Sequence, residues 1–361
     1  MRILHVAESI KGGCGTYLNQ IVRCQLVDPA IAAVRTILPE AHAGQVPDIP
    51  ASDRVLLDHP GGRSVRSIAA LRRTIAEQIR GFEPDCVHLH STFAGLAGRL
   101  CARPALGPVP IVYCAHGWAF DMERSALRNR AIALAERLLS RRCDRVVAIS
   151  DYERRRGIAI GIAPDRIVTV LNGMADIAPP PPPVPGPIRR VLFIGRLDRQ
   201  KGIDVLFAAV DGLADRIALR VIGTTVVGDQ PIDPAPADGV TMLGWCDEDR
   251  IRSELAWCDV VVVPSRWEGF GLVAVEAMRS GRAVIASDVG GLPEVVDRGA
   301  TGLLVPVEDP QALRHALLSA SDAQIVAMGQ AGRQRFLDRF TIDRTVDGLS
   351  RVYAQSIANR T

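Results

Sequence analysis

The sequence predicts two α/β domains, each a doubly wound, Rossmann-like parallel sheet. The chain has 361 residues, which exceeds the size at which a single hydrophobic core usually keeps growing. Short apolar runs alternate with amphipathic segments, a pattern typical of parallel sheets covered by helices. This rhythm is interrupted by consecutive prolines at 179–183, a stretch that a helix or sheet would hardly accommodate.

The prolines define the predicted domain boundaries. Residues 1–175 form an N-terminal domain, 176–187 a stiff, extended linker, 188–340 a C-terminal domain, and 341–361 a C-terminal helix. Residues 228–239, which precede the predicted strand at 240–243, are rich in proline and aspartate and are expected to form a mobile surface loop. The apolar runs predict strands at 3–7, 34–38, 55–57, 86–90, 111–114, 146–149 and 167–171, and then at 191–194, 219–222, 240–243, 260–263, 284–286 and 303–305.

Composition limits the classes of function. Hydrophobic residues make up 48% of the chain, enough for two cores, whereas aromatic residues make up only 4%. That scarcity argues against a stacking platform for single-stranded nucleic acid. The net charge is +3, but residues 1–175 carry 23 basic and 16 acidic residues (+7), and the remainder carries 20 and 24 (−4). The first half is therefore basic and the second acidic.

The cysteines and the N-terminus indicate the compartment. Eight cysteines are scattered without Cys-x-x-Cys spacing, which supports neither a zinc site nor a disulfide scaffold. Several fall in apolar segments, as reduced core cysteines do. The chain enters its first strand at once, without the longer apolar region of a signal peptide, and no run approaches the roughly 18 apolar residues of a membrane span. We expect a cytoplasmic protein.

Two glutamates flank one predicted strand-to-helix loop. Glu268 follows an apolar strand, and Glu276 lies about a turn and a half into the expected helix 272–279. At that end of a parallel sheet ligands bind, and a helix N-terminus favours an anion. Gly269 and Gly271 allow close backbone approach. The arrangement suits a ligand that has both hydroxyls and phosphates.

A second loop carries paired cations. Gly195 and Arg196 end another apolar strand, and Lys201 precedes the expected helix 203–210. An arginine and a lysine on one strand-to-helix loop form a plausible diphosphate clamp. Lys11 is the one other lysine among 43 basic residues, so a lysine in this loop is an unusual choice for a merely solvated position.

Together these segments resemble the retaining glycosyltransferases of the GT-B fold, specifically glycosyltransferase family 4, also called glycosyl transferases group 1. The similarity covers most of the chain through residues 170–173, 195–202, 264–276, 286–294 and 302–305. The resemblance implies two Rossmann-like domains facing each other across a cleft, with the last helix crossing back onto the first domain. It also implies transfer of a sugar, with retention, from a nucleotide diphosphate sugar to a hydroxyl.

The resemblance assigns roles in the second domain. Arg196 and Lys201 would bind the diphosphate, Glu276 the ribose hydroxyls and Glu268 hydroxyls of the donated sugar. The resemblance suggests that the acceptor attacks from the same face as the leaving group, in which case Glu268 does not act as a nucleophile. The residues alone leave a double displacement open. Positioned cations can stabilise a leaving diphosphate without a metal. The predicted nucleotide-sugar contacts in this domain are Gly195, Arg196, Lys201, Gly269, Phe270, Gly271, Leu272 and Glu276.

In the first domain, Gly13 and Gly15 follow the first strand and open a helix, so their amides could approach a phosphate or sugar. They lack the full Gly-x-Gly-x-x-Gly spacing, and loop flexibility explains them equally well. His116 follows the strand at 111–114, where the family commonly places a histidine against the donor sugar; a structural histidine is the alternative. His88 and His90 lie within a strand and are interpreted as packing or acceptor-side residues. Glu8 and Ser9 leave the first strand toward the same cleft and are candidate acceptor contacts.

The predicted partners follow from this reading. The donor is a UDP-sugar first and GDP-mannose second, on family frequency, and the acceptor is a saccharide or a lipid-linked sugar. No cofactor, metal or nucleic acid is expected, because no Asp-x-Asp motif stands where it would hold a metal-bound diphosphate. A peripheral contact with the anionic inner face of a membrane is expected from the basic residues Arg124, Arg128, Arg130, Arg137, Arg141, Arg142, Arg154, Arg155 and Arg156.

Three alternatives remain open at this level. A nucleotide-dependent dehydrogenase would share the sheets but needs a complete glycine fingerprint, which the first loop lacks. A sugar-nucleotide epimerase of similar shape would act without an acceptor. A catalytically idle nucleotide-sugar-binding subunit would keep the clamp but show no turnover.

Overall fold

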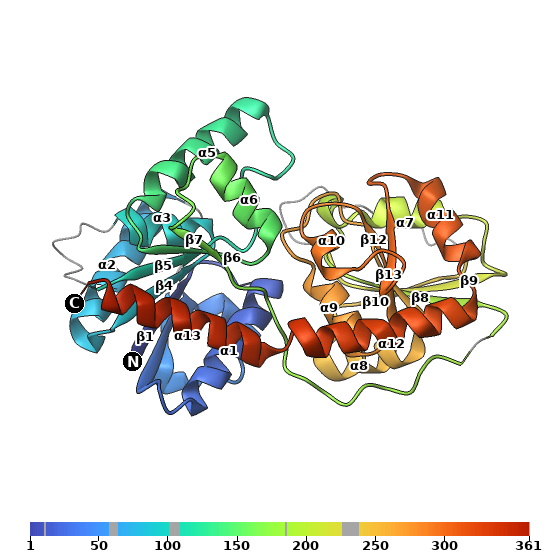
Figure 1. Cartoon of the computed structure of the whole chain (residues 1–361), viewed down its shortest axis with the longest axis horizontal. Coiled ribbons are helices and arrows are strands. Elements are labelled where there is room, and N and C mark those ends of the chain that lie inside the picture. Colours follow the sequence, from blue (N-terminus) through green and yellow to red (C-terminus); the bar gives the residue numbers. More distant parts are fainter. Residues whose placement is uncertain (11, 58–63, 101–108, 185, 226–237, 361) are drawn as a thin grey trace. The chain divides into compact units, whose positions relative to one another are not determined.

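A computed structural model describes residues 1–10, 12–57, 64–100, 109–184, 186–225 and 238–360. The chain divides into two compact units (Figure 1). Unit 1 comprises Met1–Ala175 with Ile342–Thr361, and unit 2 comprises Asp176–Thr341. The linker therefore belongs to unit 2 and the last helix to unit 1.

Unit 1 is built on a seven-stranded parallel sheet with the order β3-β2-β1-β4-β5-β6-β7. Its strands are β1 (Arg2–Ala7), β2 (Ala33–Pro39), β3 (Arg54–Leu57), β4 (Cys86–His90), β5 (Ile111–Cys114), β6 (Arg145–Ala148) and β7 (Ile167–Thr169). Its helices are α1 (Gly13–Val27), α2 (Val65–Phe82), α3 (Thr92–Leu100), α5 (Ala126–Ser140), α6 (Asp151–Ala159) and α13 (Ile342–Ala358), with 3₁₀ turns η1 (Glu40–Gln45) and η2 (Ala51–Asp53).

The two faces of this sheet differ in polarity. Alternate residues such as Leu4 and Leu89 pack into an apolar core with Ile75 of α2. The next residue of each strand, His5 in β1 and His90 in β4, points to the other face of the sheet and is fully buried there. On that face α13 lies beside α1 (Figure 1). A polar group in the centre of a parallel sheet is unusual, because such strands are normally apolar on both faces.

Unit 2 is built on a six-stranded parallel sheet with the order β10-β9-β8-β11-β12-β13. Its strands are β8 (Arg189–Ile194), β9 (Ile217–Ile222), β10 (Val240–Gly244), β11 (Val260–Val263), β12 (Ala283–Ser287) and β13 (Gly302–Val305). Its helices are η3 (Arg199–Lys201), α7 (Ile203–Val210), α8 (Glu248–Trp257), α9 (Leu272–Arg279), α10 (Leu292–Val295), α11 (Pro310–Ser319) and α12 (Asp322–Arg339).

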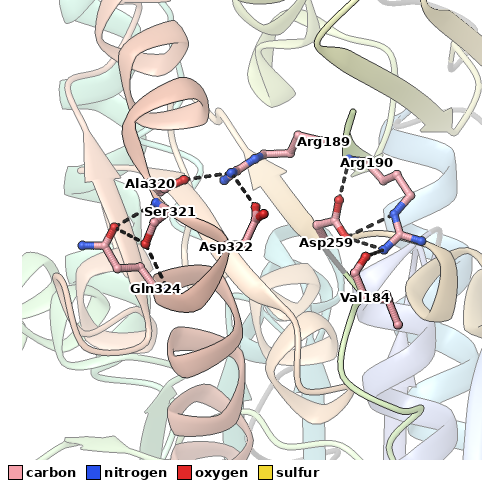
Figure 2. Close-up of polar contacts among 8 residues, drawn as sticks. All are labelled: Val184, Arg189, Arg190, Asp259, Ala320, Ser321, Asp322 and Gln324. Carbon is pink, nitrogen blue, oxygen red and sulfur yellow. Dashed lines mark hydrogen bonds and ion pairs between the residues drawn. The ribbon is translucent and has the colours of Figure 1, made fainter. Parts of the chain in front are cut away.

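The proline-rich linker is held along unit 2 by arginine side chains. Arg282 donates to the carbonyl of Pro181 at 2.8 Å, and Arg190 donates to the carbonyl of Val184 at 3.1 Å. Figure 2 shows Arg189 and Arg190 at the start of β8 pointing to opposite sides. Arg190 also pairs with Asp259 before β11, at 2.5 Å. These arginine side chains bind the stiff, extended linker to unit 2.

The strand predictions are confirmed. All thirteen expected strands are present, with ends within two residues of the predicted ones, and helices 203–210 and 272–279 have the expected bounds. The expected loop at 228–239 lies almost entirely outside the described residues. The fold class of two Rossmann-like units is likewise confirmed.

Each sheet reverses its strand order at one point, between β1 and β4 in unit 1 and between β8 and β11 in unit 2. Loops on either side of such a switch point diverge, and ligands of open α/β sheets bind at the carboxyl ends of the strands there. The candidate residues follow these strands.

Candidate functional site

In unit 2, the loops that follow β8 and β11 are bound to one another. The backbone amide of Arg266 donates to the carbonyl of Gln200 at 2.8 Å, and the Gln200 side chain donates to the carbonyl of Trp267 at 3.1 Å. The Arg266 guanidinium then bridges the Arg199 carbonyl at 2.8 Å and the Asp204 carboxylate at 2.6 Å. These bonds make the two predicted ligand loops a single structural element.

The centre of this element is an ion pair. Lys201 Nζ lies 2.5 Å from Glu268 Oε2, and the two side chains are only 19% and 14% exposed. Ser265 Oγ donates to the same carboxylate oxygen at 3.4 Å. The lysine that was predicted to bind the diphosphate is thus paired with the glutamate that was predicted to bind the sugar.

Arg196, the other predicted clamp residue, lies on the same loop. Its guanidinium pairs with Asp198 at 3.0 Å and donates to Gln200 at 2.6 Å, while 42% of the side chain remains exposed. The loop is compact because the end of β9 closes against it. A Cβ added to Gly223 would lie 1.8 Å from the Gly195 carbonyl oxygen, and Gly223 has φ +142°.

The start of α9 is shaped by glycines. Gly271 is the N-cap with φ 103°, a conformation that favours glycine. After β12, a Cβ on Gly290 would lie 1.9 Å from the Glu268 carbonyl oxygen, and one on Gly291 would lie 2.3 Å from that of Gly269. The Gly291 amide also donates to the Glu268 carbonyl at 3.0 Å. The loop after β12 therefore packs directly against the backbone of the loop that carries Glu268.

Glu276 lies inside α9 with 14% of its side chain exposed, 3.5 Å from Arg279. Burial raises the pKa of its carboxyl, which means that a hydrogen-bond donor such as a ribose hydroxyl would stabilise the ionised form. The Phe270 ring is 2% exposed and packs edge-on against Phe340, so only its backbone is available to a ligand. Leu272 is the first residue of the helix, as predicted.

In unit 1, three histidines and a glutamine form a chain across four elements. His116 Nε2 lies 3.0 Å from His90 Nδ1, and His90 Nε2 lies 2.9 Å from His5 Nδ1. His5 Nε2 then lies 2.7 Å from Gln25 Oε1 of α1. His116 stands just after β5 with φ 55°, a backbone conformation that costs roughly 1–2 kcal/mol in a residue other than glycine and is often found at functional sites.

His88 extends this group toward the last helix. Its Nδ1 lies 2.7 Å from the Tyr353 hydroxyl of α13, and its ring centroid lies 4.0 Å from that of His90. Burial lowers the pKa of His5 and His116 to about 4, and burial together with neighbouring imidazoles lowers the pKa of His88 and His90 well below 6.5. All four rings are therefore neutral near pH 7.

His5, His88 and His90 are also close enough to share a metal, since their candidate ligand atoms lie within 4.8 Å of one another. On a tetrahedral zinc with bonds of about 2.0–2.1 Å, ligand nitrogens would stand about 3.3 Å apart. The His5 and His90 nitrogens instead face each other at 2.9 Å, which is hydrogen-bond distance. A hydrogen-bonded chain accounts for the geometry directly.

The glycines after β1 have a packing explanation. A Cβ on Gly15 would lie 2.3 Å from the Ile10 carbonyl oxygen, so the loop closes directly on α1. Gly13 is the exposed first residue of that helix. Contact of either with a ligand stays a prediction, as do the proposed acceptor contacts of Glu8 and Ser9, which follow β1.

Sequence reasoning noted His88 and His90 but missed His5, Gln25 and Tyr353. One signal was present, because residues two apart in a strand share a face. Which strand lies beside β4, and therefore that His5 stands opposite His88, depends on the strand order.

The predicted basic surface is only partly free. Arg156 is held by Asp121 at 2.8 Å and 2.6 Å. On α5, the only acid, Glu136, is buried against Arg99 at 2.9 Å, so the exposed face of this helix carries positive charge alone. That face also exposes three leucines that sequence reasoning missed, Leu127 (79%), Leu134 (54%) and Leu138 (51%).

Comparison with known proteins identifies the family. Residues 188–322 match the model of the glycosyl transferases group 1, and residues 12–173 match a glycosyl transferase 4-like domain. Together these matches span both units, and the chain belongs to the group 1 glycosyltransferases, as the motifs predicted. A dehydrogenase is thereby set aside.

Relatives and solved structures agree with this assignment. The chain is 31% identical to an uncharacterized 41.2 kDa protein in the cps region of Klebsiella pneumoniae, covering 86% of this chain and 87% of the relative. It is 31% identical to D-inositol 3-phosphate glycosyltransferase 1 of Catenulispora acidiphila, covering 96% and 91%. Sucrose-phosphate synthase from Thermosynechococcus elongatus superposes with a TM-score of 0.82 at 22% identity, covering 99% and 100%, which confirms the GT-B fold.

HepE from Anabaena, solved in complex with UDP-glucose, superposes with a TM-score of 0.77 at 20% identity and covers 98% of this chain and 100% of that one. Among the described residues, no helix is both long and apolar enough to cross a membrane. The cysteines of the described ranges are free thiols, and Cys101 lies outside those ranges.

The buried histidines predict acid sensitivity of unit 1. The unfolded chain binds protons near pH 6.5, whereas folded His5 does so near pH 4. Between these values the unfolded state holds more protons, so stability is constant above pH 6.5 and falls as the pH drops toward 4, by about 1.4 kcal/mol per unit for each such histidine. Native-state hydrogen exchange of β1 and β4 amides between pH 7.5 and 5 measures this.

The matched control is His88→Gln, which removes one titrating ring from the same sheet face. The slope of opening free energy against pH should decrease by about 1.4 kcal/mol per unit in this variant. An equal slope in both proteins would mean that these rings are not held neutral.

Proposed function

We propose that this protein transfers a sugar, with retention, from a nucleotide diphosphate sugar to a hydroxyl of a saccharide or lipid-linked acceptor, in the synthesis of a cell-surface polysaccharide or glycolipid. The observation that carries the proposal is the joined pair of strand-end loops in unit 2, with Lys201 and Glu268 in contact at the switch point. One loop supplies cations for a diphosphate and the other supplies carboxylates for hydroxyls.

The chemistry follows from charge. Departure of a nucleoside diphosphate leaves negative charge on its terminal phosphate and positive character on the sugar. Lys201 and Arg196 stabilise the leaving group, and preorganised charges in a partly buried site are worth more than they would be in water. Neither role needs a metal. Glu268 holds sugar hydroxyls, Glu276 holds the ribose and His116 contacts a hydroxyl of the donated sugar.

The Lys201–Glu268 pair also positions both side chains before the donor binds. While the carboxylate is engaged by Lys201, its second oxygen remains available to a sugar hydroxyl. The diphosphate in turn approaches a lysine whose position is already set. Binding and orientation are thus prepared before the donor arrives, which reduces the entropic cost of the reactive arrangement.

The relatives support the choice of substrates. HepE was solved with UDP-glucose, so a UDP-sugar is our first donor and GDP-mannose our second. The Klebsiella relative is a protein of a cps region, which favours polysaccharide synthesis. A sugar-nucleotide epimerase or an idle binding subunit differs in its products, since neither yields a new glycosidic bond when donor and acceptor are mixed.

Three alanine variants test the site. Lys201→Ala should lose a charge-assisted contact worth about 1.5 to 3 kcal/mol and weaken UDP affinity about tenfold to a hundredfold. Glu276→Ala should also weaken UDP binding. Glu268→Ala should leave UDP affinity unchanged or raised, because it frees Lys201, while transfer collapses. Calorimetric titration with UDP, beside slow donor hydrolysis in a panel of sugar nucleotides, measures both quantities.

Arg199→Ala is the matched control, since Arg199 is a charged residue of the same loop that pairs with Glu308 and has no assigned role in the site. It should behave like the unmodified protein. Equal loss of UDP affinity in the Glu268 and Glu276 variants would contradict the division of roles, and unchanged values in folded Lys201→Ala would remove the clamp.

We also propose that α5 holds the protein at the anionic inner face of a membrane, where lipid-linked acceptors are found. Leu127, Leu134 and Leu138 lie seven and four residues apart and so form one stripe along the helix. Arg130 and Arg137 are exposed beside it. An apolar stripe bordered by basic residues is typical of helices that lie in a membrane interface.

Liposome co-sedimentation tests this contact. The protein should prefer anionic over neutral vesicles at low salt, with about 1 kcal/mol from each engaged arginine, and should be released at high salt, because the attraction is screened over about 8 Å at physiological ionic strength. Leu134→Ser and Arg137→Gln should each weaken binding. Val27→Ser is the control, since Val27 is 82% exposed on α1 of the same unit. Absence of any preference for anionic lipid would point to a soluble acceptor.

A further inference from the structure

The buried chain in unit 1 has a direction. A neutral imidazole carries one N–H and one lone pair, so it donates at one ring nitrogen and accepts at the other. His5, His90 and His116 are neutral because burial lowers their pKa values. When neutral rings bond in series, the group at the end of the series decides which nitrogen of every ring carries its proton.

That end group is Gln25, whose carbonyl Oε1 lies 2.7 Å from His5 Nε2. With the Gln25 side chain in this orientation, its carbonyl oxygen can only accept, so His5 carries its proton on Nε2 and presents a lone pair at Nδ1. His90 Nε2 therefore donates across the 2.9 Å contact, and His116 Nε2 donates to His90 Nδ1 across 3.0 Å. His116 is left with its lone pair on Nδ1, at the half-buried end of the chain.

We propose that Gln25, acting through His5 and His90, fixes the tautomer of His116 and is a positioning residue for sugar recognition. The inference deepens the proposed function, because it rests on His116 contacting the donated sugar. A lone pair at Nδ1 accepts a hydroxyl hydrogen and repels an anionic oxygen. This tautomer therefore favours a neutral hexose over a sugar that carries a carboxylate.

The surroundings of the chain favour this control. His5, Gln25 and His90 are fully buried, so bulk water does not replace a lost partner. The rings stack with centroids 5.2 Å apart for His5 and His90 and 5.3 Å apart for His90 and His116. Tyr17 packs edge-on against His116 at 4.7 Å. These contacts hold the rings in one orientation, so the hydrogen-bond direction passes from ring to ring.

The test is ¹⁵N nuclear magnetic resonance of histidine-labelled protein, in which long-range couplings show the protonated nitrogen of each ring. His5, His90 and His116 should all carry the proton on Nε2. In Gln25→Met, which keeps the volume and removes the acceptor, His116 should become a mixture of tautomers. The kcat/KM of the Gln25→Met variant should fall about tenfold, which corresponds to the loss of about one hydrogen bond in the transition state. Its UDP affinity should be unchanged.

His90→Asn provides the matched second variant, because an asparagine oxygen can take the place of the acceptor Nδ1 while the link to His5 is cut. In that background, Gln25→Met should have no further effect on the His116 tautomer or on kcat/KM. If Gln25 acts by packing alone, the two losses multiply instead.

A His116 proton on Nδ1 in the unmodified protein, or an unchanged tautomer in folded Gln25→Met, would overturn the proposal. So would one zinc ion bound per purified chain at these histidines. The spectra require no substrate, so they test the chain even if the donor is not a nucleotide sugar. Only the kcat/KM comparison depends on the proposed function, because it requires transfer of a sugar.

Discussion

The contact between Lys201 and Glu268 joins the two predicted ligand loops of unit 2. These residues are 67 positions apart and follow two strands that are neighbours only because the strand order reverses between β8 and β11. A partly buried ion pair of this kind costs desolvation, which direct contact and further hydrogen bonds offset. Here Ser265 and the Gln200 and Arg266 bonds supply that support. The same groups that join the loops are those suited to a diphosphate sugar.

Unit 1 applies a different principle at the equivalent point of its sheet. Instead of paired charges it buries neutral imidazoles, which can specify hydrogen-bond direction without a net charge. One sheet face thus provides an apolar core, and the other provides a polar chain between α1 and α13. Because α13 contributes Tyr353, the final segment of the sequence completes the environment of residues from its first strand.

Much of the fold could be predicted from the sequence, because parallel strands buried on both faces leave continuous apolar runs such as 260–263. The loops that carry Arg196, Lys201, Glu268 and Glu276 could be placed for the same reason, since each begins where such a run ends. The pairing of Lys201 with Glu268 could not, because it depends on strand order and on side-chain rotamers rather than on local pattern.

Other features were hidden for similar physical reasons. Gly15 suggested ligand approach, but the carbonyl of Ile10, brought against α1 by the fold, explains why no side chain fits there. The five prolines predicted a stiff, extended linker but not its partners. The carbonyls of an extended segment are open to donors, and Arg190 and Arg282 bind two of them from other positions in the sequence. Exposed leucines on α5 were indistinguishable from core leucines until their partners were known.

We have proposed that the loops after β8 and β11 form one nucleotide-sugar site. Hydrogen exchange measured with and without UDP tests it most directly, because it reports on each loop separately and requires no substitution. Peptides covering 195–202 and 265–276 should become protected together, at the same UDP concentration. Protection of only one of these loops, or of neither while UDP binds elsewhere, would contradict it.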